Sequence, residues 1–271
     1  MKLTEANYYS REANLHYFSV SQFKDFMKCP AMAMAKLRGE YEDRATRALL
    51  LGKFVDEMLT GTRKSQMEFI EENREDLIKK DGNYYADVAQ AVGTIERIKQ
   101  QPKMMHYLNG KHQVIMTGEI EGVPFKIKMD SFDENEFIAD LKYMKSLRSP
   151  NLFQPMIKYW GYDYQAGAYQ EIVRQNIGKR LPFFFDVGTK EKPAHLALGE
   201  INQWNMDEAL DVIKKNIVRF QKIKTGELPA ERCEDYDCDH CTTTKIITEA
   251  IDTDLFGMST AQIKAMKGEI I

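Results

Sequence analysis

The sequence predicts an α/β fold, in which helices flank a central mixed sheet and a helical part forms the N-terminal region. Apolar residues recur at helical spacing in three stretches before residue 110. From about residue 113 the spacing changes to short runs rich in β-branched and aromatic residues, which are typical of strands. Helical spacing returns near residue 159, so both kinds of element are expected to contribute to one core.

The N-terminal region is expected to contain three helices. The first, over residues 17–37, begins with Ser19 and Gln22 at the spacing of a capping box, and Pro30 should kink or split it. The other two are expected over residues 46–60 and 84–100.

The middle of the chain predicts a three-stranded meander over residues 113–120, 123–132 and 137–144. The expected elements after it are a helix over 159–176, strands over 181–189 and 195–200, and a helix over 206–225. With no internal repeat, one domain over 1–271 is the simplest organisation. It comprises a helical part (1–110), an α/β core (111–225) and a cysteine-containing C-terminal appendage (226–271).

The composition is that of an ordinary soluble protein, with 43% hydrophobic and 29% charged residues among 271. No apolar run approaches the ~20 residues that span a bilayer, and the N-terminus lacks the apolar core of a secretory signal. We therefore expect a cytoplasmic protein with no membrane partner. The net charge of −3 gives no global sign of nucleic-acid binding, although basic groups can be confined to one cleft.

Carboxylates and a lysine lie on two adjacent predicted strands. Asp130 ends one strand, and Asp140-Leu141-Lys142 lies in the next. Side chains alternate along a strand, so Asp140 and Lys142 point together and Leu141 turns into the core. Pairing of the strands can bring Asp130 close to Asp140, where facing carboxylates destabilise a sheet unless a cation such as Mg²⁺ or Mn²⁺ neutralises them. Lys142 would then orient or deprotonate a water, or stabilise charge on a phosphate oxygen.

The other interpretation of these residues is the solvated polar face of an amphipathic hairpin. Two helices add to the first interpretation. Asp56 shares an apolar stripe with Leu49, Gly52 and Leu59, which suits a metal ligand, a buried hydrogen bond or an edge position equally. Gln165 and Tyr169 share a helical face beside Gly167, which permits close approach; an incidental polar stripe on a packed helix fits them too.

Together these residues resemble the PD-(D/E)XK nuclease superfamily, its RecB-type branch, and the RecE-like exonucleases of phages and prophages within that branch. The family pattern is a Gly-x-x-x-His (or acid) helix, an Asp ending one strand, (D/E)-x-Lys on the next, and a Gln-x-x-x-Tyr helix. The chain has these parts in order, over residues 17–245, as Gly52…Asp56, Asp130, Asp140-Leu141-Lys142 and Gln165…Tyr169. It departs from the pattern in having Asp56 where many relatives have His, and Asp140 where some have Glu.

The resemblance implies a restriction-endonuclease-like core and metal-dependent hydrolysis of phosphodiester bonds at the ends of linear duplex DNA. Asp56, Asp130, Asp140 and the Leu141 carbonyl would hold Mg²⁺ or Mn²⁺, Lys142 would be the catalytic lysine, and Gln165 and Tyr169 would contact substrate or water. It further implies 5′-to-3′ resection for a single-strand annealing protein in phage-type recombination, and a ring-shaped homo-oligomer. An inactive DNA-binding scaffold and a repair endonuclease of the same fold are the alternatives. The candidate phosphate contacts are Lys126, Lys128, Lys145 and Arg148.

The four cysteines predict a second, structural centre. Cys233, Cys238 and Cys241 form a tight C-x4-C-x2-C cluster, and Cys29 lies far away in the sequence. In a cytoplasmic protein this spacing favours a metal over disulfides, either Zn²⁺ or an iron–sulfur cluster, and His240 is a further candidate ligand for zinc. Some RecB-type nucleases hold a [4Fe–4S] cluster with one early and three late cysteines. That resemblance favours the cluster, with Zn²⁺ as the alternative.

Overall fold

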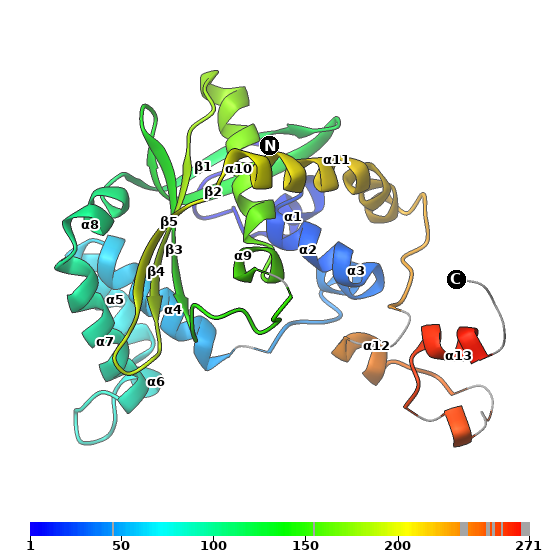
Figure 1. The fold of residues 1–271 in the computed structure, drawn as a ribbon, viewed down its shortest axis with the longest axis horizontal. Coiled ribbons are helices and arrows are strands. Elements are labelled where there is room, and N and C mark those ends of the chain that lie inside the picture. Colours follow the sequence, from blue (N-terminus) through cyan, green and yellow to red (C-terminus); the bar gives the residue numbers. More distant parts are fainter. Residues whose placement is uncertain are drawn as a thin grey trace. The chain divides into compact units, whose positions relative to one another are not determined.

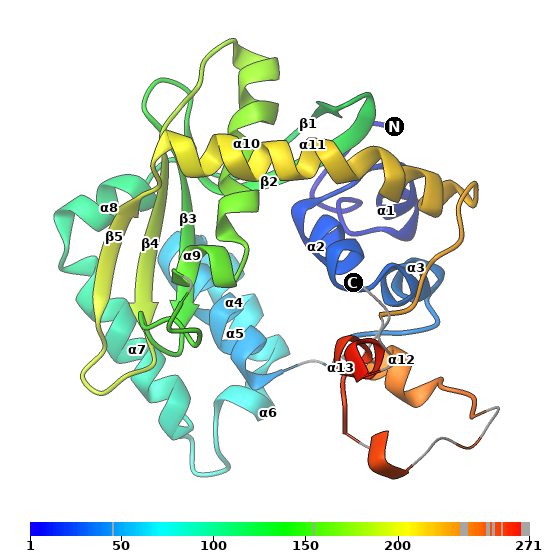
Figure 2. The same ribbon diagram turned by 45° about the vertical axis from the view of Figure 1, so that its right-hand side comes forward.

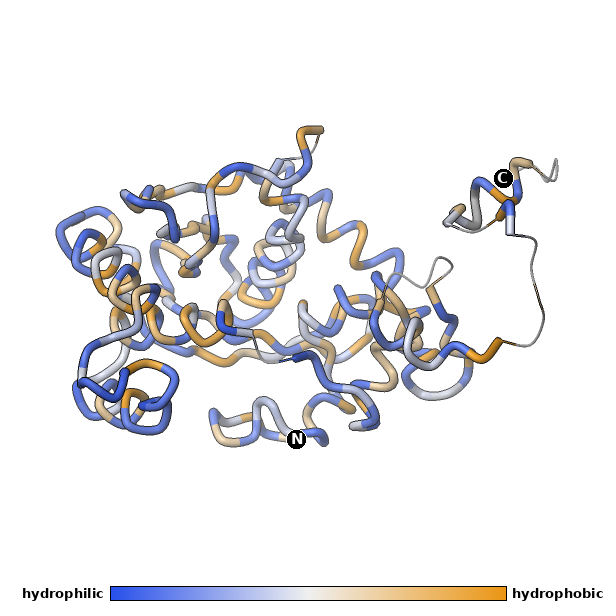
Figure 3. The backbone as a smooth tube through the Cα atoms, turned by 90° about the horizontal axis from the view of Figure 1, so that it is seen from below, coloured by the Kyte–Doolittle hydropathy of each residue, from blue (hydrophilic) through white to orange (hydrophobic). Residues whose placement is uncertain are grey.

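The computed structural model describes residues 1–44, 46–153, 155–233, 238–247, 250, 253–255 and 257–266. The chain divides into two compact units. The sheet unit contains Met1–Val20 and Arg44–Asn216, and the cysteine unit contains Ser21–Asp43 and Ile217–Ile271. Apolar and polar stretches alternate along the backbone (Figure 3), and no described helix has the length and apolar character to cross a membrane.

A five-stranded mixed sheet is the centre of the sheet unit (Figure 1). Its strands lie in the order of the sequence: β1 (Lys111–Ile120), β2 (Val123–Asp133), β3 (Phe137–Met144), β4 (Phe183–Thr189) and β5 (Leu196–Glu200). Neighbours are antiparallel except β3 and β4, which are parallel. A parallel pair needs a crossover, and the segment that contains α10 (Tyr162–Ile177) supplies it. The predicted meander and mixed sheet are confirmed.

Helices cover both faces of this sheet (Figure 2). On one face, Leu141 packs into a core built with α4 (Arg47–Thr60), α7 (Ala86–Lys99) and α8 (Pro102–Leu108). On the other face, the α10 rings of Tyr162 and Tyr169 contact Phe185 and Phe183. Because successive strand residues alternate, Asp140 and Lys142 point toward α10 while Leu141 points toward α4 and α7.

The remaining helices among the described residues are α1 (Arg11–His16), α2 (Val20–Lys28), α3 (Pro30–Arg38), α5 (Arg63–Glu72), α6 (Arg74–Leu77), α9 (Met156–Tyr159), α11 (Gln203–Thr225), α12 (Asp239–Thr243), the 3₁₀ turn η1 (Thr253–Leu255) and α13 (Thr260–Met266). The helix predicted over 17–37 is split as expected, since Pro30 occupies the first turn of α3. Thr46 caps α4, its side chain accepting a hydrogen bond from the Leu49 amide.

The cysteine unit joins segments that lie far apart in the sequence. The Phe220 ring of α11 packs against Phe23 and Phe26 of α2, with centroids 5.6 and 5.4 Å away. The buried Lys224 ammonium donates to Gln22 Oε1 at 2.9 Å. These contacts place α2 and the end of α11 in one small core.

Candidate functional site

Strands β2 and β3 separate at the predicted acidic residues. In the described strands their ladder runs from Asp133 opposite Phe137 to Ser131 opposite Ala139. Continued by one residue, this register sets Asp130 opposite Asp140. Here the Leu141 amide donates to Asp130 Oδ2 at 3.2 Å, so a carboxylate accepts in place of a backbone carbonyl. The predicted proximity of Asp130 and Asp140 is therefore observed, at an opening of the sheet.

Lys142 lies against these acids. Its ammonium forms an ion pair with Asp140 Oδ2 and lies 4.9 Å from the centroid of the Tyr162 ring. Burial on its own would lower the pKa of this ammonium, but the charges of Asp140 and Asp130 outweigh burial and raise it. Lys142 is therefore a charged group held on the carboxylates.

Asp56 of α4 joins the same electrostatic cluster. Burial, followed by the charge of Asp140, raises its pKa, and a hydrogen bond from the Thr60 hydroxyl at 3.3 Å opposes the rise. Burial likewise raises the pKa of Asp130 well above its usual range, with Asp140 and Asp56 adding to the effect. Three carboxyl groups thus repel one another in a partly desolvated place, where a divalent cation would relieve the repulsion.

The predicted apolar stripe of α4 is wrong in one respect. Leu49 is 56% exposed, and the buried face of the helix is made by Leu51, Phe54 and Val55. Asp56 directly follows this face and is half-buried, so it lies at its edge. One turn earlier, a Cβ on Gly52 would meet no atom within 4 Å, which leaves space beside Asp56.

The two α10 residues have different positions. Gln165 donates from Nε2 to Asp140 Oδ1, inside the cluster. Tyr169 donates its hydroxyl to the Lys128 carbonyl of β2 at 3.0 Å, and burial raises its pKa well above the usual value. The close approach predicted at Gly167 is observed, because a Cβ there would lie 2.5 Å from the Met206 carbonyl oxygen of α11.

Two further titratable residues escaped sequence reasoning. His112 of β1 has Nδ1 3.2 Å from the Asp130 carbonyl oxygen, and its charge lowers the pKa of Asp56. Asp186 of β4 pairs with Leu141 and is fully buried, and neither carboxylate oxygen has a hydrogen-bond partner among the described residues. Burial, with a contribution from Asp140, raises the pKa of Asp186 to about 7. An acid inside the apolar run Phe183–Val187 was the available signal for it.

The candidate phosphate contacts differ in exposure. Lys126 is buried, with its ammonium donating to the Tyr8 carbonyl and to Asn14 Oδ1, so it does not present itself to a phosphate. The N-terminal segment, which pairs Phe18 with Phe125, accounts for this burial. Lys128 lies 4.7 Å from the centroid of the Tyr9 ring. The other two candidates, Lys145 and Arg148, are exposed.

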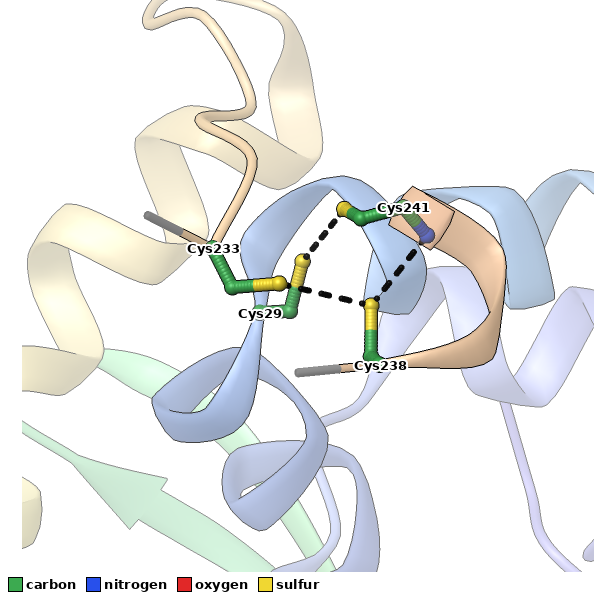
Figure 4. A group of neighbouring side chains, drawn as sticks. All are labelled: Cys29, Cys233, Cys238 and Cys241. Atoms are coloured by element: carbon green, nitrogen blue, oxygen red, sulfur yellow. Dashed lines mark hydrogen bonds between the residues drawn. The ribbon is translucent and has the colours of Figure 1, made fainter. Parts of the chain in front are cut away.

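All four cysteines meet in the cysteine unit (Figure 4), their sulfur atoms within 4.8 Å of one another. The Sγ atoms of Cys29 and Cys241 are 3.5 Å apart, and those of Cys233 and Cys238 are 3.6 Å apart. Burial raises the pKa of the Cys241 thiol to about 12, so a metal is needed to hold it as a thiolate. The His240 ring instead packs against Tyr41, with centroids 5.6 Å apart.

The sheet has acids at the β2–β3 opening, a lysine two residues after Asp140, and α10 packed across the same face. Together these features define a PDDEXK-like fold. The chain belongs to the family described as PDDEXK-like domain of unknown function (DUF3799), whose sequence profile matches residues 19–244. The predicted fold class is thereby confirmed.

One solved structure is similar over nearly the whole chain. It is the crystal structure of a protein from Eubacterium rectale described as a "putative exonuclease", with 37% sequence identity and a TM-score of 0.86 over 95% of this chain and 99% of that one. A second, of SSO0001, has 16% identity and a TM-score of 0.39 over 89% and 93% of the two chains. A comparison with curated proteins gives no match.

Proposed function

We propose that this protein is a metal-dependent deoxyribonuclease that hydrolyses phosphodiester bonds from the ends of linear duplex DNA. The observation that carries the proposal is the cluster of the Asp56, Asp130 and Asp140 carboxyl groups at the β2–β3 opening, with the Lys142 ammonium paired to Asp140. Family membership supports a nuclease, and the similarity to the Eubacterium rectale protein supports an exonuclease.

The residues of the opening fit a hard divalent cation. Carboxylate and carbonyl oxygens are the ligands that Mg²⁺ and Mn²⁺ prefer, and here Asp56, Asp130, Asp140 and the Leu141 carbonyl would supply them. The three carboxyl groups repel one another, and a bound cation would remove this repulsion, so the site fits a cation. When bound, the ion supplies an activated water and stabilises charge on the phosphate oxygens.

The protein's own side chains would position the ligands of that ion and stabilise the reacting phosphate. Lys142 would orient or deprotonate a water, or stabilise the charge that develops on a phosphate oxygen. Gln165 holds the Asp140 carboxylate in orientation. Tyr169 fixes the backbone of β2 two residues before Asp130. The open space at Gly52 would admit the substrate beside Asp56.

The finer parts of the proposal follow the resemblance to RecE-like exonucleases. They are 5′-to-3′ resection, delivery of a 3′ strand to a single-strand annealing protein in phage-type recombination, a ring-shaped homo-oligomer and a cytoplasmic location. Lys145 and Arg148 are exposed and follow the catalytic strand, so they are the basic residues proposed to contact phosphates.

The test is digestion of linear duplex DNA in Mg²⁺, labelled at one 5′ or one 3′ end, by the wild type and by Lys142→Ala and Asp130→Ala. We expect loss of the duplex with wild type only, and the order in which the two labels are released gives the polarity. Equal degradation by all three proteins would exclude this site as the catalyst. Cleavage of closed circular DNA would replace the exonuclease with an endonuclease, and a folded wild type without activity would support a binding scaffold.

A further inference from the structure

We propose that the four cysteines hold a single tetrahedral Zn²⁺ ion, in place of the [4Fe–4S] cluster that the family resemblance implies. The zinc would be structural and would join α3 to the segment after α11. This proposal concerns the cysteine unit alone and is independent of the nuclease reaction.

The spacing of the sulfur atoms favours one ion. Zinc–thiolate bonds of ~2.3 Å set the ligands of a tetrahedral site about 3.8 Å apart. Here two pairs of sulfurs are 3.5 and 3.6 Å apart, and all four lie within 4.8 Å of one another. The sulfur–sulfur distance expected for a tetrahedral zinc site lies within the range of these observed distances.

The same distances do not fit a cubane cluster. In a [4Fe–4S] centre each thiolate binds a different iron atom. The four sulfurs then surround the whole cluster and must stand further apart than they do around one ion. Every sulfur in this group would have to move outward, although three of the four cysteines are buried.

Backbone groups hold the thiols in their present positions. The Met32 amide donates to Cys29 Sγ at 3.5 Å, and the Cys241 amide donates to Cys238 Sγ at 3.4 Å. The Arg232 guanidinium donates to the Cys241 carbonyl at 2.8 Å. Such outer hydrogen bonds orient metal ligands, so the sulfur positions are supported rather than incidental.

The site is closed, which is the property of a structural zinc. Among the described residues the group contains four cysteines and no other ligand, so a tetrahedral ion would have no position left for water or substrate. The ligand spacing agrees, because Cys238 and Cys241 have the C-x2-C spacing of zinc knuckles. Cys29 and Cys241 are 212 residues apart, so one ion would close a very long loop.

Metal analysis of the full-length protein tests the proposal directly. The protein would be produced in medium supplied with both iron and zinc and purified without oxygen. We expect one zinc per chain by elemental analysis and no visible absorption. Iron at about four atoms per chain, with a broad visible band that bleaches on reduction, would overturn the proposal. So would a folded protein with no bound metal.

A second measurement avoids dependence on variants that fail to fold. Replacing zinc with Co²⁺ in the wild type should give the intense visible and thiolate-to-metal bands of a tetrahedral tetrathiolate centre at one cobalt per chain. Cys238→Ser should lose these bands, whereas Lys142→Ala should retain them. Cobalt spectra typical of octahedral oxygen ligands, or bands unchanged by Cys238→Ser, would contradict the assignment.

Discussion

Gln165 donates a hydrogen bond to Asp140, and the Lys142 ammonium pairs with the other oxygen of the same carboxylate. The amide comes from α10, the helix that lies between β3 and β4 in the sequence and packs against the sheet. The carboxylate is thus held from both sides before any cation binds. A ligand fixed in this way loses little freedom when it takes a metal.

Gln165→Ala should therefore weaken Mn²⁺ binding ~10–100-fold, the usual effect of losing an outer partner of a metal ligand. Calorimetric titration with Mn²⁺ in the absence of DNA measures it. Gln175→Ala is the matched control, since Gln175 lies on the same helix but bonds the backbone of Glu119. Equal affinities in the two variants would show that the amide does not orient Asp140.

Asp130→Asn should stabilise the metal-free protein while abolishing cleavage. Without a cation, the half-buried Asp130 carboxylate is repelled by Asp140 and Asp56, and replacing it with a neutral amide relieves this repulsion. Thermal unfolding in EDTA should give a higher Tm for the variant than for the wild type. Added Mn²⁺ should raise the Tm of the wild type and change that of the variant little. A variant that is less stable in EDTA would mean that the bond from the Leu141 amide outweighs the repulsion.

The strands and the two central acids were accessible from the sequence because both depend on local patterns. All five strands begin and end within about two residues of their predicted limits. Sequence patterns missed several short helices, because each is too short, or in α5 too polar, to show a helical stripe. Among the described residues these are α1, α5, α6, α8, α9, α12 and α13.

The residues that escaped prediction depend on packing between distant segments. His112 reaches the acids because β1 sets it opposite Ser131. Asp186 lies close enough to Asp140 to feel its charge because the parallel register sets it opposite the next residue, Leu141, whose face of the sheet it shares. Lys126 looked like a surface lysine, and only the N-terminal segment around Tyr8 and Asn14 buries it. Register across a crossover and the docking of a terminus leave no periodic trace in the sequence.

Asp186→Asn should make the metal-free protein more stable at alkaline pH. The folded state holds this proton with a pKa of about 7, whereas an unfolded Asp has a pKa of ~3.9. The contribution of the protonated Asp186 carboxyl group to the free energy of unfolding is thus complete below pH ~4. It is lost as the pH rises through about 7. Well above that pH the ionised carboxylate costs of order 4 kcal/mol, which the amide avoids.

Urea unfolding in EDTA at pH 5 and pH 8.5 measures this difference. At pH 8.5 the free energy of unfolding of the variant should exceed that of the wild type by several kcal/mol. At pH 5 the difference should be much smaller. Asp211→Asn, at an exposed position of α11, serves as the control and should leave the pH profile unchanged. Parallel profiles for the wild type and Asp186→Asn would show that Asp186 is not forced to ionise in a buried place.

Gly167→Ala and Gly52→Ala should have opposite effects on stability, although both glycines lie inside helices. At Gly167 the new Cβ would lie 2.5 Å from the Met206 carbonyl and 3.2 Å from the Leu210 amide nitrogen, so α10 and α11 must separate. Overpacking of this kind costs ~1–3 kcal/mol. At Gly52 the Cβ meets nothing within 4 Å, and alanine favours a helix by ~0.5–1 kcal/mol.

Activity then distinguishes what the space at Gly52 is for. If DNA passes beside Asp56, as the proposed function requires, Gly52→Ala should raise the free energy of unfolding and yet lower kcat/KM on duplex DNA. Mn²⁺ affinity should stay unchanged, because the new methyl group lies one turn from the carboxylate. A stabilised variant with full activity would place the substrate on another side of the cluster, so that Gly52 would be only a tolerated residue of α4.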